Sequence, residues 1–291
     1  MSGRLALAGA AFLYGSTFVV VQRATEDLTP AAFLAIRFSV GVAALALWPR
    51  LRPRPLPGVA SRSGLATAGA AAGAALLAGY ALQTVGLQYT STSSSAFITG
   101  LFVVFTPLLG ALVLRRHLRP PTLVAVALAT AGLFLLTGAD VRFSRGDALT
   151  LGCAVAFAAH ILVVGEVAGR FDAVRLNRVQ LGVVAGGAAL ALPLTGLGRV
   201  SGAALAGAAF TGVVASALAF TLQLHGQRYV GPAESALLLS LEPVFAGAFG
   251  YAVGERLGAA GVVGAALILV AVAVAQSGPT RRPAGRLDRA V

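Results

Sequence analysis

The residue of this sequence most able to do chemistry is an acid inside an otherwise apolar run. Glu242 lies roughly ten residues into a run that begins at Pro232, which in a helix is about 15 Å along the axis. Pro243 follows, removes one backbone donor and frees a carbonyl group one turn earlier. A carboxylate at such a break can bind a proton or a substrate amine. Alternatively, a protonated Glu242 hydrogen-bonds the loosened backbone and has only a structural role.

Arg37 is a second ionisable group that lies within an apolar run. Its guanidinium group can attract a substrate carboxylate or pair with an acid on another helix. It can equally extend to the outer surface of a membrane or fix the packing of its helix. His160 titrates near physiological pH and could join a proton route, although a single histidine in an apolar helix is more often a packing residue.

Six further polar side chains lie within apolar runs, and we expect them to face a central cavity. Gln83 and Gln223 lie near the ends of their runs, so hydrogen bonding at a membrane interface is the alternative for these two. The six residues are Tyr14, Tyr80, Gln83, Thr99, Gln180 and Gln223.

The composition requires a membrane around most of the chain. Of 291 residues, 57% are hydrophobic and 11% are charged, whereas soluble globular proteins carry about 25% charged residues. Too little polar surface remains to cover a water-soluble body, so we predict an all-α, polytopic membrane protein. The net charge of +12 does not indicate nucleic-acid binding, because the basic residues, all of them arginines, lie singly and in small groups between apolar runs.

Ten apolar segments are long enough to cross a bilayer, which takes about 20 residues of helix. Prolines interrupt several of them, and Pro107 in the fourth and Pro243 in the ninth are predicted helix breaks. The ten predicted spans are residues 5–22, 30–49, 64–87, 93–114, 121–138, 147–165, 179–197, 202–224, 232–253 and 258–276.

The arginines also predict how the spans are oriented. With the N-terminus in the cytoplasm, 16 arginines fall on cytoplasmic segments and 5 on outer loops, while Arg37 lies within a span. We therefore expect both termini in the cytoplasm and a basic, disordered tail at 277–291. Glu234 lies beside Arg228 just inside the membrane, and we expect the two to form an interfacial ion pair.

The two halves of the chain repeat one layout. An offset of 143 relates the first two spans of each half and pairs Tyr14 with Phe157 and Arg37 with Gln180. Five spans in each half invert the second copy, as in secondary transporters that hold substrate at the interface between repeats. An offset of 140 relates later residues, namely Gln83, Gly86, Tyr89, Ser95 and Ala96 to Gln223, Gly226, Tyr229, Ser235 and Ala236.

Several short motifs occur in a distinctive order along the chain. They are Tyr14-Gly15-Ser16-Thr17-Phe18, Pro30 with Arg37-Phe38, Gln88-Tyr89-Thr90-Ser91-Thr92-Ser93-Ser94-Ser95-Ala96, Gly146-Asp147, Leu241-Glu242-Pro243 and Gly254-Glu255-Arg256-Leu257. With these motifs the chain resembles the drug/metabolite transporter superfamily, EamA type. The first half departs from the family pattern, since it lacks the Asn-Pro and Gly-Glu-Arg motifs and has Phe102-Val103 opposite Glu242-Pro243.

The resemblance implies two five-helix repeats, at 1–138 and 139–276, in a multi-pass carrier of the bacterial inner membrane. It also implies alternating access and, commonly, export of amino acids or other metabolites. We therefore predict a secondary transporter that exports small polar metabolites, either proton-coupled or facilitative. A strict exchanger of phosphorylated or nucleotide-linked metabolites is the alternative, but it would need several basic groups in the cavity, and only Arg37 qualifies.

Other classes of function are disfavoured. The sequence has no Gly-x-Ser-x-Gly, no His-Glu-x-x-His and no phosphate-binding Gly-x-x-x-x-Gly-Lys-Ser/Thr loop, so we expect no enzyme activity. A structural or sensory membrane protein would need longer soluble segments. We expect no cofactor and no metal, since Cys153 is the single cysteine and matches no ligand spacing. The expected partners are a small-molecule substrate and the lipid bilayer, without nucleic acid, for a monomer or a homodimer.

Overall fold

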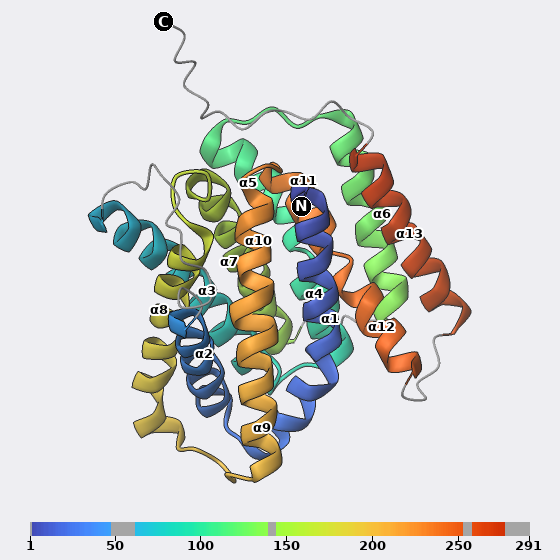
Figure 1. Cartoon of the computed structure of the whole chain (residues 1–291). Coiled ribbons are helices and arrows are strands. Elements are labelled where there is room, and N and C mark those ends of the chain that lie inside the picture. Colours follow the sequence, from blue (N-terminus) through green and yellow to red (C-terminus); the bar gives the residue numbers. More distant parts are fainter. Residues whose placement is uncertain (1, 48–61, 139–143, 253–257, 277–291) are drawn as a thin grey trace, which may run out of the picture.

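The computed structural model describes residues 2–47, 62–138, 144–252 and 258–276, and these form helices joined by short connections. The predicted tail at 277–291 and the Gly254-Glu255-Arg256-Leu257 motif lie outside the described residues. Most helices run between the same two ends of the molecule (Figure 1). In chain order they are α1 (Gly3–Asp27), α2 (Pro30–Leu47), α3 (Arg62–Gly86), α4 (Thr92–Gly100), α5 (Phe102–Leu114), α6 (Pro120–Thr137), α7 (Arg145–Val167), α8 (Ala173–Thr195), α9 (Gly202–Thr211), the π-helix η2 (Gly212–Ala219), α10 (Phe220–Gln227), α11 (Pro232–Leu239), α12 (Glu242–Ala252) and α13 (Ala259–Gln276).

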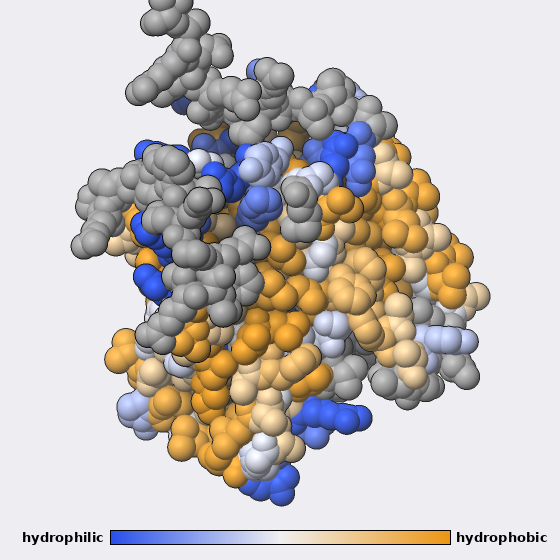
Figure 2. All heavy atoms as spheres, in the orientation of Figure 1, coloured by the Kyte–Doolittle hydropathy of each residue, from blue (hydrophilic) through white to orange (hydrophobic). Residues whose placement is uncertain are grey.

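These helices form the ten predicted spans. Among the described residues, nine stretches are long and apolar enough to cross a membrane. The helix α1, with 25 residues, is not one of these nine but lies beside them. Three spans consist of consecutive helices: α4 and α5, α9 to α10, and α11 with α12. On the face drawn in Figure 2, hydrophobic residues cover the middle of the molecule, and hydrophilic residues gather towards the two ends. The predicted all-α membrane fold is confirmed.

Side-chain caps fix where several helices begin. Ser144 and Asp147 cap the start of α7 reciprocally: the Asp147 N–H donates to Ser144 Oγ (3.1 Å), and the Ser144 N–H donates to Asp147 Oδ2 (2.7 Å). Asp172 accepts a hydrogen bond from the N–H of Arg175 at the start of α8. The helix therefore begins at Ala173, ahead of the predicted start at 179, and its first turn contains Arg175.

The fourth and the ninth span are each broken near mid-length. At both breaks the backbone tightens in the same way: the Leu101 N–H donates to the Ile98 carbonyl (3.1 Å), and the Leu241 N–H donates to the Leu238 carbonyl (3.3 Å). These residues are 140 positions apart, which is the offset of the sequence repeat. The break is thus a feature of the repeat.

Only one of the two predicted proline breaks lies at a break. Pro243 is the second residue of α12, where the missing N–H costs no helical hydrogen bond. Pro107 lies inside α5, and the fourth span breaks at Leu101 instead. Because no proline adjoins Leu101, proline is not the shared cause of the two breaks.

The two halves of the chain pack on each other as two inverted five-helix repeats, which confirms the predicted fold class. Contacts join α2 to α8, α6 to α13, and α3 to both α7 and α8. The packing of α1 on η2 and α10 is the counterpart of the packing of α7 on α3. The interface between the halves therefore contains most of the helix contacts.

One close helix contact occurs twice, once for each half. A Cβ atom on Gly3 would lie 2.9 Å from the Gly226 carbonyl oxygen, and one on Gly146 would lie 2.5 Å from the Gly86 carbonyl oxygen. Small residues allow such close approach of membrane helices. Gly3 and Gly146 are related by the offset of 143, and Gly86 and Gly226 by the offset of 140.

An aromatic contact repeats in the same manner. The rings of Tyr14 and Phe220 meet edge to face at 5.3 Å, and so do the rings of Phe157 and Tyr80. Each pair has one hydroxyl group, but on opposite members of the pair. The repeat thus preserves the ring packing while it moves the polar group.

The repeat symmetry fails in the eighth span. Residues Gly212–Ala219 form the π-helix η2, whereas the matching residues 72–79 belong to the α-helix α3. π-Helical segments are rare in proteins, and those that do occur often lie at functional sites. Because η2 contacts α1 and α2, this irregular segment lies beside the helices that carry Tyr14 and Arg37.

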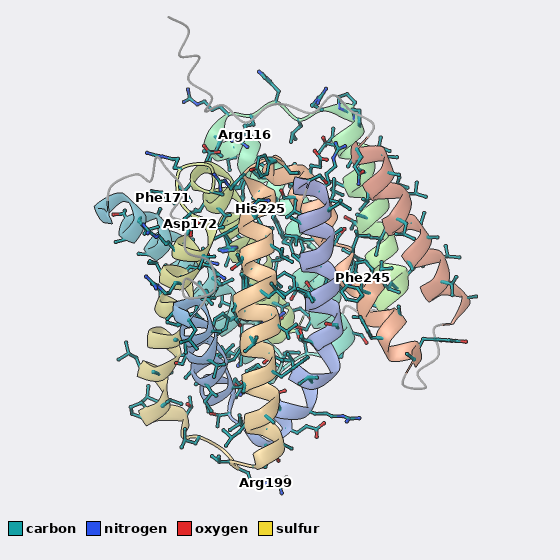
Figure 3. All side chains as sticks on the ribbon, viewed as in Figure 1. Arg116, Phe171, Asp172, Arg199, His225 and Phe245 are labelled. Carbon is teal, nitrogen blue, oxygen red and sulfur yellow. The ribbon has the colours of Figure 1, made fainter. Side chains whose placement is uncertain are left out.

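Two ion pairs join helices at the end of the molecule where α1 begins. Arg4 Nε lies 2.6 Å from Glu234 Oε1 and links α1 to α11, so Glu234 pairs with Arg4 and not with the predicted Arg228. Arg116 pairs with Glu166 at the same end (Figure 3). Both pairs join one half of the chain to the other.

The opposite end has a different connection. Asp27, the last residue of α1, accepts hydrogen bonds from Ser201 Oγ (2.6 Å) and from Arg199 Nε (2.9 Å), and Arg199 lies at this end in Figure 3. The Ser201 hydroxyl and then the Arg199 guanidinium hold the pKa of Asp27 below its usual value. This connection joins α1 to the start of α9.

Candidate functional site

A cavity of about 430 Å³ lies where the two halves meet. Its size falls in the usual range for small-molecule sites, roughly 300–1,000 Å³. Eight of the nine side chains predicted for the pathway line it, and Gln180 lies behind the wall. The lining residues are Tyr14, Thr17, Val21, Thr25, Arg37, Leu76, Tyr80, Gln83, Leu87, Ser95, Ala96, Thr99, Phe102, Phe157, His160, Ile161, Phe220, Gln223, Leu239 and Glu242.

Both helix breaks open onto this cavity. Phe102 and Glu242 are the first residues of α5 and α12, occupy matched positions of the repeat and both line the cavity. The N-terminus of a helix favours a negative charge, so the start of α12 suits the Glu242 carboxylate. No described residue hydrogen-bonds this carboxylate, which leaves it available on the cavity wall.

Arg37 is buried in the wall and does not reach the outer surface, since 5% of its area is exposed. Its Nε donates to Ser216 Oγ of η2 at 3.0 Å. Its guanidinium carbon lies 5.3 Å from the centre of the Phe38 ring and 5.5 Å from that of Tyr80. Aromatic rings and one hydroxyl therefore hold the guanidinium group in place at the cavity.

Arg37 and Glu242 carry opposite charge into the same space. Both side chains line the cavity, and no direct ion pair joins them. A molecule bound in the cavity would therefore meet both groups.

The remaining polar groups of the wall form short links between helices. Tyr14 Oη donates to Gln223 Oε1 at 2.9 Å, and Gln83 Nε2 donates to Thr99 Oγ1 at 3.1 Å. Both glutamines line the cavity. Gln223 Nε2 in turn donates to Gln227 Oε1 at 3.2 Å. The α1–α10 and α3–α4 contacts each carry one of these links.

A buried polar chain runs behind the wall at His160. His160 Nε2 lies 3.0 Å from Gln180 Oε1, and Gln180 Nε2 donates to Asn177 Oδ1 at 2.9 Å. Asn177 Nδ2 reaches the carbonyl oxygens of Ser216 and Ala217, each at 3.1 Å. This chain connects the cavity to η2.

Three residues in and behind this wall could hardly be predicted from the sequence. Thr17 belongs to a recognised motif but was not assigned to the cavity. Asn177 lies before the predicted start of its span, and Ser216 is a small hydroxyl residue in an apolar run. The one signal in the sequence was that Asn177 is polar and lies three residues before Gln180.

The cavity reaches one end of the molecule. Its lining includes the exposed residues Thr25 and Leu87, which lie near the ends of α1 and α3. Towards the other end, buried side chains of α1, α5 and α11, among them Leu7, Val103 and Leu237, form a continuous core. The Arg4–Glu234 pair lies beyond that core. The described residues therefore enclose a cavity that is open on one side.

No ligand set for a metal occurs in the described part of the chain, where no three His, Cys, Asp or Glu side chains come together. The architecture is that of a membrane transporter: two inverted helical repeats with a cavity between them at broken helices.

Comparisons with known proteins identify the family. Residues 1–138 and 144–276 match the EamA-like transporter family, so the chain belongs to this family, and the predicted resemblance is confirmed. An uncharacterized transporter of Archaeoglobus fulgidus is 33% identical over 272 residues, which cover 93% of this chain and 84% of the relative. A second one from that organism is 27% identical over 94% of this chain and 96% of its own length.

More distant relatives agree with this assignment. The uncharacterized transporter YyaM of Bacillus subtilis is 25% identical over 215 residues, 70% of each chain. A solved crystal structure that is 18% identical superposes with a TM-score of 0.80 and covers 95% of this chain and 98% of the other. At this identity the superposition shows the shared fold alone.

Proposed function

We propose that this transporter exports small polar metabolites such as amino acids by alternating access, as a secondary transporter. One observation carries the proposal: an acid and a base, Glu242 and Arg37, share a cavity of small-molecule size that opens on one side. Charged groups within membrane spans are costly and mark substrate or ion paths.

An amino acid matches this pair of charges. Its carboxylate would meet the Arg37 guanidinium, which has N–H donors beyond the one used by Ser216. Its ammonium group would meet the Glu242 carboxylate. Apolar walls at Phe157 and Phe220 suit an aliphatic or aromatic side chain. In a proton-coupled cycle, Glu242 would bind a proton when the substrate has left.

The distribution of arginines supports an orientation with both termini in the cytoplasm of a bacterial inner membrane. The open end of the cavity then faces outwards, and the Arg4–Glu234 and Arg116–Glu166 pairs lie on the cytoplasmic side. The state described here is, in this proposal, the outward-facing state. Movement of repeat 1–138 against repeat 139–276 would open the other side.

An exchanger of phosphorylated metabolites is supported less well. A phosphate group is normally held by several basic groups. Arg37 is the one arginine or lysine among the described residues that line the cavity. We propose that the protein works as a monomer or a homodimer.

Reconstitution tests the proposal. Liposomes that contain the protein are loaded with unlabelled amino acids, and counterflow of each labelled amino acid is measured with and without a pH gradient. We expect saturable exchange by the wild type and loss of its pH dependence in Glu242→Gln. Arg37→Gln should weaken transport of amino acids more than that of the corresponding amines. Wild-type liposomes that behave like empty ones with every amino acid would exclude this substrate class.

A further inference from the structure

The buried chain behind His160 has a direction that is fixed at its far end. Asn177 Nδ2 lies 3.1 Å from the carbonyl oxygens of Ser216 and Ala217. Carbonyl oxygens only accept hydrogen bonds, so this end of the Asn177 side chain must be the NH₂ group. A flipped amide would place three acceptors together in a site where Asn177 is fully buried.

The orientation of the Asn177 amide fixes that of the Gln180 amide. Because Asn177 Oδ1 is then the acceptor, Gln180 Nε2 donates to it at 2.9 Å. The other end of the Gln180 amide is the oxygen Oε1, which also only accepts, and it lies 3.0 Å from His160 Nε2. His160 Nε2 must therefore carry a proton.

The second ring nitrogen of His160, Nδ1, is available on the cavity side. In a neutral imidazole with Nε2 protonated, Nδ1 carries the lone pair and accepts a hydrogen bond. The His160 side chain lines the cavity, whereas Gln180 does not. No described residue hydrogen-bonds Nδ1, and this atom is not one of the fully buried polar atoms that lack a partner.

We propose that His160 presents Nδ1 to the cavity as an acceptor of fixed tautomer, which receives an N–H or O–H group of the transported molecule. Asn177 and Gln180 are its positioning residues, and the carbonyl groups of η2 are their anchor. This proposal rests on the proposed function. An acceptor of fixed tautomer distinguishes the two ends of an amino acid. An ammonium group has a proton to donate to Nδ1, whereas a carboxylate would meet a lone pair and is directed to Arg37.

A spectroscopic experiment tests the tautomer without any substrate. The full chain is labelled with ¹⁵N-histidine and studied in lipid bilayers by solid-state NMR, in which bare and protonated imidazole nitrogens have distinct shifts. The chain has three histidines, and the signal of His160 is assigned by its loss in His160→Gln. We expect a bare Nδ1 and a protonated Nε2. The Gln180→Met substitution should abolish this bias, whereas Thr130→Val, which changes an in-span hydroxyl of α6 that does not line the cavity, should preserve it.

A chemical probe tests whether the lone pair faces the cavity. Diethyl pyrocarbonate reacts with a bare imidazole nitrogen, and mass spectrometry locates the product. We expect His160 of the wild type in vesicles to be modified. A protonated Nδ1 in the NMR spectrum, or a His160 that resists the reagent while the exposed His117 reacts, would overturn the inference whatever the transport assay gives.

Two substitutions then separate the ring nitrogens in transport. Asparagine places its side-chain oxygen near the position of Nδ1, whereas glutamine reaches the position of Nε2. A hydrogen bond to a charged group corresponds to roughly a tenfold or greater effect. We therefore expect His160→Gln to raise the KM for the exchanged amino acid about tenfold, and His160→Asn to raise it about threefold or less. Equal KM values for the wild type and both variants would refute the substrate contact. If the wild type exchanges no amino acid, the proposed function fails. The NMR and diethyl pyrocarbonate experiments, which need no substrate, still test whether His160 presents a bare Nδ1 to the cavity.

Discussion

The close contact between Gly15 and α12 gives the sharpest prediction, because it lies against the turn that carries Glu242. A Cβ atom on Gly15 would be 2.7 Å from the Glu242 carbonyl oxygen, 2.8 Å from Ala246 N and 2.8 Å from Phe245 Cβ. Ordinary contact begins at 3.4 Å, so Gly15→Ala requires a shift of about 0.7 Å, the difference between 3.4 and 2.7 Å. Two of the three atoms belong to the backbone and cannot turn away. Phe245 of α12 is labelled beside α1 in Figure 3.

The expected cost follows from these distances. Overpacking of this degree destabilises by about 1–3 kcal/mol, and the helix preference of alanine over glycine offsets about 1 kcal/mol of it. A displacement near 1 Å at a reacting or binding group can reduce a rate by about a hundredfold. We therefore expect Gly15→Ala to unfold at a lower temperature and to exchange substrate roughly ten to a hundred times more slowly than the wild type.

A matched control lies on the same helix. A Cβ atom on Gly9 would be 3.6 Å from Leu222 Cδ1, an ordinary contact, so Gly9→Ala should keep its exchange rate and be as stable as the wild type or more so. Both variants are compared by thermal unfolding in detergent and by counterflow in liposomes. If Gly15→Ala matches Gly9→Ala in both measurements, then α12 is not held by this contact and the reasoning is refuted.

Three further predictions test the cavity and its two ends. Ser95 and Ser235 are matched, buried positions of the two repeats, but only Ser95 lines the cavity, so a membrane-impermeant maleimide added outside should label Ser95→Cys and not Ser235→Cys. Equal labelling would exclude the one-sided cavity. The Arg4–Glu234 pair is partly exposed and contributes about 0.2–1 kcal/mol. In the proposed outward-facing state this pair helps to close the cytoplasmic side, so Glu234→Gln should slow the labelling of Ser95→Cys by up to about fivefold. A faster reaction would contradict this role of the pair. The pKa of Asp27 is lowered, so its contribution to stability is present above pH 3.8, the usual pKa, and is lost as the pH falls through the lower value. Asp27→Asn should flatten this acid dependence of thermal unfolding, and an unchanged pH profile would show that the connection does not stabilise the fold.

Hydropathy predicted the spans because a bilayer leaves the backbone few alternatives to a helix. The offsets of 140 and 143 also relate the contacts that repeat in the structure, such as those of Gly3 and Gly146. Local hydrogen bonds determine where helices begin and break, which hydropathy does not predict. Asp172 starts α8 early through a single cap, and the break at Leu101 occurs without a proline.

The candidate site was predictable to the extent that polarity within a span is unusual. Glu242, Arg37 and His160 stand out in apolar runs, and the structure brings them to one cavity. Asn177 and Ser216 do not stand out, because an asparagine near a helix start and a serine in a small-residue run are common. Their importance comes from η2, and nothing in the sequence of Gly212–Ala219 announces a π-helix.

The two repeats share their packing but not their chemistry, and this difference is what the proposed carrier needs. The glycine contacts and the aromatic pairs recur in both halves, so the two halves can pack equivalently when either side of the cavity is open. Matched positions in the cavity and its wall differ instead: Arg37 stands opposite Gln180, and Glu242 stands opposite Phe102. A substrate held by charges on unlike positions has one preferred orientation in a nearly symmetric scaffold. In the proposed cycle the scaffold would alternate while the site keeps its polarity, with Glu242 as the acid on which that polarity would most depend.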